Sequence, residues 1–306
     1  MKLLLEPLPP FRLDLTAWAL RRRPTNIVDR WDGETYRRVI QLGGEAVEIA
    51  VVQTGPADAP ELRVDVAGLR GRRQEVAAVL ERLLGLRTSL DGFYALAADN
   101  PGLSALAERF RGVKPPRFTT VFESLVNGIA CQQLSLNVGI ILLNRLAENF
   151  GPMAGGAYGF PTPAALKGQD PERLRALGFS RQKAKALLAL AEVAVNKAVD
   201  LDGTAALGDE DAKKRLLALR GVGRWTAEYA MLRGLGRTHV FPGDDVGARN
   251  GLTRWLGRSR PLDYQDVQRI LVAWQPYAGM VYFHLLLQSL EDKGYLAPPP
   301  DPRMPR

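Results

Sequence analysis

Asp244 and Asp245 are the residues best suited to chemistry in this sequence, because two adjacent carboxylates follow the loop 240–243 and precede a predicted helix. A carboxylate in such a place can stabilise positive charge that develops on a reacting carbon, or orient a water molecule for attack. The same pattern is also a common helix start, in which an aspartate accepts hydrogen bonds from the first backbone N–H groups. Both interpretations hold together if Asp244 caps the helix and Asp245 faces the substrate.

A tight turn, Gly221-Val222-Gly223, ends 22 residues before Asp245 and separates two predicted helices. Together they form a predicted helix-hairpin-helix over residues 209–234. Glycines would let a phosphate approach the exposed N–H groups that begin the second helix, where the helix dipole favours an anion. A glycine that only ends a helix is the alternative, and the turn by itself does not decide between them.

Positive charge is concentrated around this turn. Residues 213–260 contain eleven Lys and Arg but only three acidic residues, while the rest of the chain has 30 of each. The whole formal net charge of +8 therefore lies in this segment. A basic segment around a phosphate-binding turn is typical of a nucleic-acid-binding surface, so nucleic acid is the expected partner.

Two stretches together resemble the helix-hairpin-helix DNA glycosylases. The first is Leu-Arg-Gly-Val-Gly-Arg-Trp-Thr-Ala at 219–227, and the second is Phe-Pro-Gly-Asp-Asp at 241–245. Within that superfamily the sequence is most similar to the bacterial 3-methyladenine DNA glycosylase II type, and the similarity extends over most of the chain. The resemblance implies an enzyme that flips a damaged base out of duplex DNA and hydrolyses its N-glycosidic bond, as one step of base excision repair.

The resemblance also assigns a reaction type. Asp245 would be the catalytic carboxylate, with Asp244 in a supporting role. Superfamily members that also cut the strand have a lysine where this chain has Trp225, because an amine is needed for a Schiff base. We therefore expect a monofunctional hydrolase without lyase activity, which removes alkylated purines such as 3-methyladenine and 7-methylguanine and leaves an abasic site. A glycosylase for oxidised or deaminated bases and a non-catalytic DNA-binding protein remain the alternatives.

The remaining site assignments follow from the same resemblance. Gln133 would fill the gap left in the duplex, and the carbonyls of Leu217, Leu219 and Val222 could bind a monovalent cation, with no redox or organic cofactor required. Leu286 stands where a close relative has a tryptophan, so the pocket can differ in width. The expected base pocket consists of Gln132, Trp225, Tyr229, Tyr282, Phe283 and Leu286, and the expected DNA contacts are Gln133, Leu134, Arg220, Gly221, Val222, Gly223, Arg224 and Thr226.

Composition narrows the class of protein further. With 306 residues, 46% hydrophobic and 24% charged, the chain is expected to be an ordinary soluble, cytoplasmic protein, and a monomer. A single cysteine, Cys131, allows no disulfide within the chain and excludes the iron–sulfur branch of the superfamily. His239 and His284 are too far apart to suggest zinc. No segment is long enough to be a membrane span or a signal peptide.

The elements that must position these residues divide the chain into three segments. Residues 1–87 are expected to form an α+β N-terminal domain, a small antiparallel sheet with helices. Residues 88–292 are expected to form a mostly α-helical, two-part glycosylase core, and the proline-rich tail 293–306 to be disordered. Lys183 and the run Arg21-Arg22-Arg23 are expected to be solvated, with DNA contact as the alternative for the run. The N-terminal domain is predicted to contain helices at 13–22 and 74–86 and strands at 36–42, 46–53 and 61–66.

Overall fold

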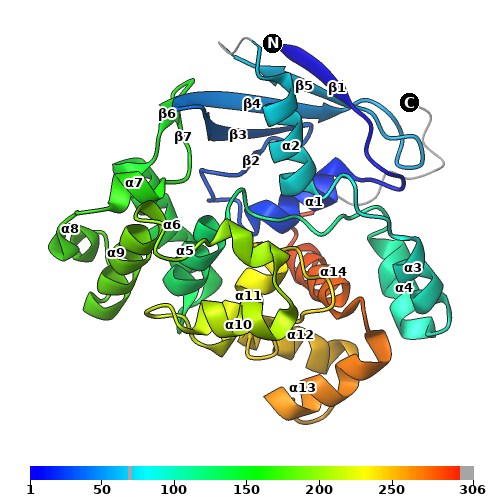
Figure 1. Cartoon of the computed structure of the whole chain (residues 1–306). Helices are drawn as coiled ribbons and strands as arrows, with labels where there is room; N and C mark the ends of the chain where they lie inside the picture. The colour runs from blue at the N-terminus through cyan, green and yellow to red at the C-terminus, as the bar shows by residue number, and fades with distance from the viewer. Residues whose placement is uncertain (68–70, 297–306) are drawn as a thin grey trace.

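A computed structural model describes residues 1–67 and 71–296. It begins with a five-stranded antiparallel sheet in the order β1-β5-β4-β3-β2, seen above the helices in Figure 1. Alternate residues of the central strands face the core, as the pairs Val51–Val64 and Ile49–Val66 show. The three predicted strands are present, whereas the first and second strands were not predicted. The strands are β1 (Lys2–Leu5), β2 (Arg30–Trp31), β3 (Thr35–Leu42), β4 (Glu45–Gln53) and β5 (Leu62–Val66).

Two helices, α1 (Leu13–Arg21) and α2 (Arg73–Leu84), share one hydrophobic core with the sheet. Val76, Leu80, Leu83 and Leu84 of α2 are completely buried in that core. Leu86 is the last residue of the chain in this core, and a separate hydrophobic core includes residues from Leu90 onward. α1 contributes to both, because Leu15 and Trp18 pack with the later helices. The sheet unit is therefore joined to the helical part by shared apolar packing.

The helical part has two hydrophobic cores, which agrees with the predicted two-part α-helical architecture. The first core joins the helices around the predicted hairpin. Its helices are α5 (Val121–Cys131), α6 (Leu136–Phe150), α7 (Pro163–Leu166), α8 (Pro171–Ala176), α9 (Arg181–Val195), α10 (Asp209–Leu217) and α11 (Arg224–Arg233). The 3-10 helix η1 (Asp202–Ala206) precedes α10, and a two-stranded hairpin of β6 (Met153–Ala154) and β7 (Ala157–Tyr158) follows α6 and contacts β3 and β4.

The second core combines helices that are far apart in the sequence, since two short helices near residue 100 pack with the three that end the chain. Figure 1 shows α3 and α4 beside α14. The elements of this second core are α3 (Asp91–Ala98), α4 (Pro101–Arg109), α12 (Val246–Trp255), α13 (Tyr264–Leu271), the 3-10 helix η2 (Val272–Trp274) and α14 (Ala278–Glu291).

The prediction of a disordered tail from residue 293 is wrong for its first residues, because the ring of Tyr295 stacks on that of Trp18 with the centroids 5.9 Å apart. Residues 297–306 of this tail lie outside the described residues.

No single helix among the described residues is long and apolar enough to cross a membrane. By length and composition alone the segments Tyr264–Trp274 and Ala278–Glu291 pass that test together, as a pair bent by 111°. Much of the second segment is buried among other helices of the protein.

Candidate functional site

The predicted helix-hairpin-helix is present, and its two glycines have different structural roles. Gly221 has φ +79°, and a Cβ there would lie 2.5 Å from Cβ of Ala186 on α9, so this position requires glycine. Gly223 is the N-cap of α11, and a Cβ there would meet nothing within 4 Å. The first N–H to bond within the helix is that of Ala227, to the Gly223 carbonyl. The N–H groups of the preceding turn are thus available to an anion.

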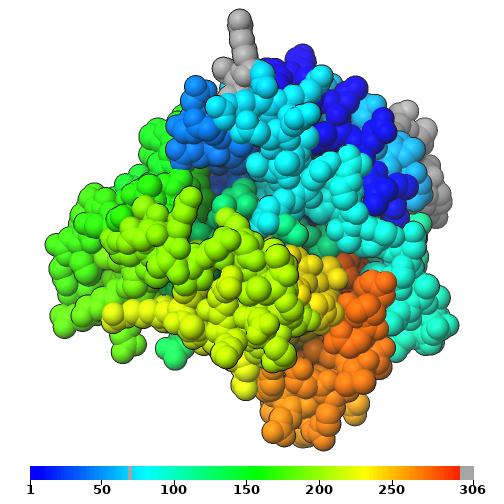
Figure 2. Space-filling model, in the orientation of Figure 1, coloured from blue at the N-terminus to red at the C-terminus, as the bar shows by residue number. Residues whose placement is uncertain are grey.

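Basic side chains surround this helix start at the surface. Arg220 and Arg224 are exposed, and the segment around α10 forms part of the face seen in Figure 2, in yellow-green. Nε of Arg224 donates to Oδ2 of Asp244 at 2.6 Å, and its guanidinium lies 3.8 Å from the ring centroid of Tyr264. Arg220 has no comparable acidic partner among the described residues. The two arginines therefore differ in how readily they can contact a phosphate.

Asp245 uses its two carboxylate oxygens for different purposes. Oδ1 accepts the N–H of Ala248 at 2.9 Å, which makes Asp245 itself the N-cap of α12. Oδ2 accepts Nε1–H of Trp225 at 3.3 Å and the hydroxyl of Tyr282 at 3.2 Å. The expectation that Asp244 caps the helix is wrong, because Asp244 is paired with Arg224 instead. One oxygen of Asp245 is thus fixed by the helix, and the other faces two aromatic donors.

The aromatic residues near Asp245 come from two helices. Trp225 stacks on Tyr229 with the ring centroids 5.5 Å apart and the planes 26° apart. Trp225 is half-buried, while Tyr229 is buried and supports it from below. Tyr282 of α14 completes the group, and burial, together with the nearby Asp245 carboxylate, raises the pKa of its hydroxyl. Protonated, Tyr282 can donate to Oδ2, so the group combines one carboxylate with flat apolar surfaces.

Two predicted site residues, Phe283 and Thr226, differ from what was expected. Phe283 is completely buried against the guanidinium of Arg233, so its assignment to the base pocket is wrong. Leu286 is half-buried and packs against the core that also contains Tyr282, so its place in the base pocket stays a prediction. Thr226 is buried, and its Oγ1 accepts from the amide of Gln132, so its side chain cannot contact DNA and only its backbone N–H remains for that purpose.

The turn between α5 and α6 is tied to the hairpin. Nε2 of Gln132 donates to the Gly221 carbonyl and to Oγ1 of Thr226, both at 2.8 Å. Nζ of Lys183 donates to the carbonyls of Ala130 and Gln132, and burial lowers its pKa, so the expectation of a solvated lysine is wrong. Gln133 at φ +54° and Leu134 stand exposed at the tip of this turn.

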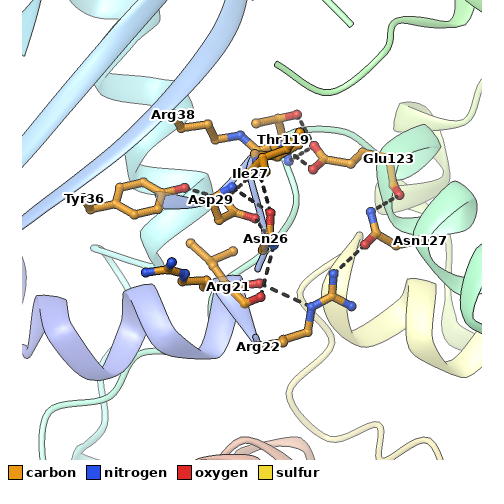
Figure 3. Close-up of polar contacts among 12 residues, drawn as sticks. Arg21, Arg22, Asn26, Ile27, Asp29, Tyr36, Arg38, Thr119, Glu123 and Asn127 are labelled. Atoms are coloured by element: carbon orange, nitrogen blue, oxygen red, sulfur yellow. Dashed lines mark hydrogen bonds and ion pairs between the residues drawn. The ribbon is translucent and has the colours of Figure 1, made fainter. Parts of the chain in front are cut away.

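A buried polar network beneath the aromatic group was not predicted from the sequence, and Figure 3 shows most of it. Arg22 of the expected solvated run is only 5% exposed, so that expectation is wrong for the middle residue. Its guanidinium donates to the Tyr229 hydroxyl at 2.9 Å and to Oδ1 of Asn127 at 2.6 Å. Arg22, at the end of α1 in the N-terminal sheet unit, thereby contacts Tyr229, on which Trp225 stacks.

Arg38 of β3 lies deeper in the same network and is paired with two buried carboxylates, those of Asp29 and Glu123. Burial by itself would raise the pKa of Asp29, but Arg38 and a hydrogen bond from Tyr36 outweigh it and lower that pKa. These contacts join β3 to α5, which also carries Asn127. The sequence signal for this network was a charged residue at a core-facing strand position, because Arg38 alternates with Tyr36 and Ile40 along β3.

Comparisons with known proteins agree on one family. The family model for the HhH-GPD superfamily base excision DNA repair protein matches residues 126–276. DNA-3-methyladenine glycosylase 2 of Escherichia coli is 28% identical over 90% of this chain and 94% of its own length. A structure described as 3-methyladenine DNA glycosylase from Archaeoglobus fulgidus matches with a TM-score of 0.83 and 26% identity, covering 96% of this chain and 100% of that one.

A further structure shares the fold at low sequence identity. It is the 8-oxoguanine glycosylase/lyase of Clostridium acetobutylicum in complex with double-stranded DNA, with a TM-score of 0.75 and 16% identity over 95% of this chain and 98% of that one. At this identity the match is one of fold alone.

Proposed function

The chain belongs to the HhH-GPD superfamily of base excision DNA repair proteins, and we propose that it is a monofunctional DNA glycosylase that excises alkylated purines from duplex DNA. The observation that carries the proposal is the geometry of Asp245. Its Oδ2 is held by Trp225 and Tyr282 at 3.3 and 3.2 Å, beside a helix start that can bind phosphate. The similarity to 3-methyladenine DNA glycosylases supports the substrate class.

The reaction requires binding of the duplex with the damaged nucleotide turned out, stabilisation of the charge on the sugar as the bond breaks, and attack by water. The duplex is gripped through its phosphates at the hairpin, with Arg220 nearby, and the damaged nucleotide is turned out of the stack. The C1′–N bond breaks, its electron pair leaves with the base, and positive charge builds on the sugar. The Asp245 carboxylate stabilises that charge, and the oxygen of a water molecule adds to C1′ while its proton is released. An alkylated purine that carries a positive charge leaves as a neutral base and needs no general acid.

The residue at position 225 supports the absence of lyase activity. A Schiff base with the sugar needs an amine, and Trp225 provides only a ring N–H that donates to Asp245. The aromatic surfaces of Trp225 and Tyr282 suit flat bases without reading one hydrogen-bonding pattern. Further parts of the proposal are a monomer located in the cytoplasm, no organic cofactor, and a monovalent cation held by the carbonyls of Leu217, Leu219 and Val222.

The test is base release from duplex DNA that contains 3-methyladenine or 7-methylguanine, comparing the unmodified protein with Asp245→Asn. We expect release by the unmodified protein only, and strand breaks only after treatment with alkali. Breaks without alkali would contradict the monofunctional assignment. Binding of the duplex without release of either methylated base would contradict the substrate class, and release of oxidised or deaminated bases would then identify a different lesion.

A further inference from the structure

The loop that carries Asp245 is held by a buried carboxylate on the hairpin helix. Glu228 of α11 is 4% exposed, and its Oε2 accepts the backbone N–H of Gly243 at 3.2 Å. Its Oε1 accepts the hydroxyl of Tyr264 at 2.7 Å and lies 3.5 Å from Nζ of Lys213. Three donors from three parts of the chain therefore meet on the Glu228 carboxylate. One of them, the N–H of Gly243, lies only two residues before Asp245 in the sequence.

Tyr264, the first residue of α13, holds the same loop from its other side. A Cβ at Gly243 would lie 2.9 Å from two ring carbons of Tyr264, so the ring lies directly against the loop backbone. Burial and the hydrogen bond to Glu228 raise the pKa of the Tyr264 hydroxyl, which keeps it a donor. Arg224 lies over the ring and is paired with Asp244. The loop is thus held at two consecutive residues before Asp245, through the backbone of Gly243 and the side chain of Asp244.

A buried carboxylate is costly for a protein, and an apolar residue of similar size often stabilises a fold as well. Asp245, in turn, must be held within about 0.5 Å of its working position to act on the sugar. Its Oδ1 is fixed by the N–H of Ala248, but the contacts of Oδ2 to Trp225 and Tyr282 are long, so the position of the loop backbone at Gly243 also determines where Oδ2 lies. We propose that Glu228 and Tyr264 are positioning residues for Asp245. This inference rests on the proposed function, in which Asp245 acts on the substrate.

Glu228→Gln is the sharpest test, because an amide presents one acceptor and one NH2 group to partners that are all donors. We expect single-turnover release of 7-methylguanine to slow at least about tenfold, which corresponds to about 1.4 kcal/mol in the barrier. Affinity for a duplex with an abasic-site analogue should stay within about twofold, since the hairpin surface is unchanged. Tyr264→Phe keeps the ring against Gly243 and should slow release less.

Asp266→Asn provides a matched control. Asp266 is also a buried acid, 7% exposed, in the same helix as Tyr264, but it bonds Arg260, Arg269 and the N–H of Asp263 rather than the catalytic loop. We expect this variant to lose stability without losing rate. A Glu228→Gln protein with the unmodified rate, or one that loses rate and DNA affinity in parallel, would overturn the proposal.

One further measurement separates this proposal from the proposed function. Hydrogen exchange of the amides at 243–248 needs no activity, and Glu228→Gln should accelerate it where Asp266→Asn does not. If the unmodified protein releases no alkylated base, the proposed function fails, while unchanged exchange in Glu228→Gln would overturn the positioning role by itself.

Discussion

The indole nitrogen of Trp225 lies 3.3 Å from Oδ2 of Asp245, and this contact links the hairpin to the carboxylate across twenty positions of the chain. Trp225 is the second residue of α11, and Asp245 is the N-cap of α12, so the two meet where two helices start side by side. Because Trp225 is only two residues after Gly223, any phosphate bound at the turn lies close to the proposed catalytic group. The proposed phosphate-binding turn and the proposed catalytic carboxylate are thus close together in the structure.

Substitutions of Asp245 should separate its role as the N-cap of α12 from its proposed role in base release. Asp245→Asn keeps an N-cap oxygen for Ala248 but removes the charge, so we expect the free energy of unfolding to change little and base release to be lost. Asp245→Ala removes both and should lower the free energy of unfolding by about 1 kcal/mol. Urea denaturation beside the release assay measures the two effects. Equal stability of both variants would show that the cap contributes nothing.

Gly221 and Gly223 form a matched pair. Gly221→Ala would force a Cβ against Ala186 at a positive φ, and we expect it to lower the free energy of unfolding by about 1–3 kcal/mol. The space around Gly223 is open and its φ is −93°, so Gly223→Ala should lower the free energy of unfolding by less than about 1 kcal/mol. Its methyl group would nevertheless stand where a phosphate approaches, and fluorescence anisotropy should show weaker duplex binding. Unchanged affinity would place the phosphate elsewhere.

Arg220 and Arg224 should differ in the salt dependence of DNA binding. Arg220→Gln is expected to reduce the slope of log affinity against log salt by about 1, as loss of one phosphate contact does. Arg224→Gln should change the slope less, because its guanidinium is already paired with Asp244. Titrations of duplex DNA at several salt concentrations measure both. Equal slopes for the two variants would contradict the assignment of Arg220 as the phosphate contact.

Arg22 should contribute to stability through its buried partners. Arg22→Met leaves the Asn127 amide oxygen without its donor, and we expect the free energy of unfolding to fall by about 1–3 kcal/mol. Asn127→Ala should add less than its own cost in the Arg22→Met background, because the two share one hydrogen bond. Arg23→Met, at the half-exposed neighbour, is the control. Strict additivity in urea denaturation would show that the pair is not coupled.

His284 should make the protein sensitive to acid. Burial lowers its pKa from 6.5 to about 4, so the folded protein keeps the ring neutral where the unfolded chain binds a proton. The free energy of unfolding should therefore fall as the pH drops from 6.5 towards 4, by up to about 3 kcal/mol from this group. His284→Leu should show a shallower fall over this window in urea denaturation. An equally steep fall would mean that other groups cause it.

The hairpin and its aspartate were predictable because their information is local. A positive φ between two helices calls for glycine, and a fixed spacing places the next helix start. Sheet strands with alternating apolar residues were predictable for the same reason, whereas β1 and β2 were not, since four and two residues give too short a pattern. Phe283 was misplaced because helical spacing alone does not decide which face of α14 meets which neighbour.

What the sequence by itself determined was the set of groups available: one hairpin, one basic segment, and a carboxylate at a helix start. What only the tertiary structure decided was the use of each group. Asp245, rather than Asp244, caps α12, and its second oxygen meets Tyr282, which is 37 positions away. Arg22 is buried against Tyr229, 207 positions away, and Glu228 holds the loop at Gly243. Burial and hydrogen-bond partners depend on which distant segments pack together, and no local pattern of residues specifies that.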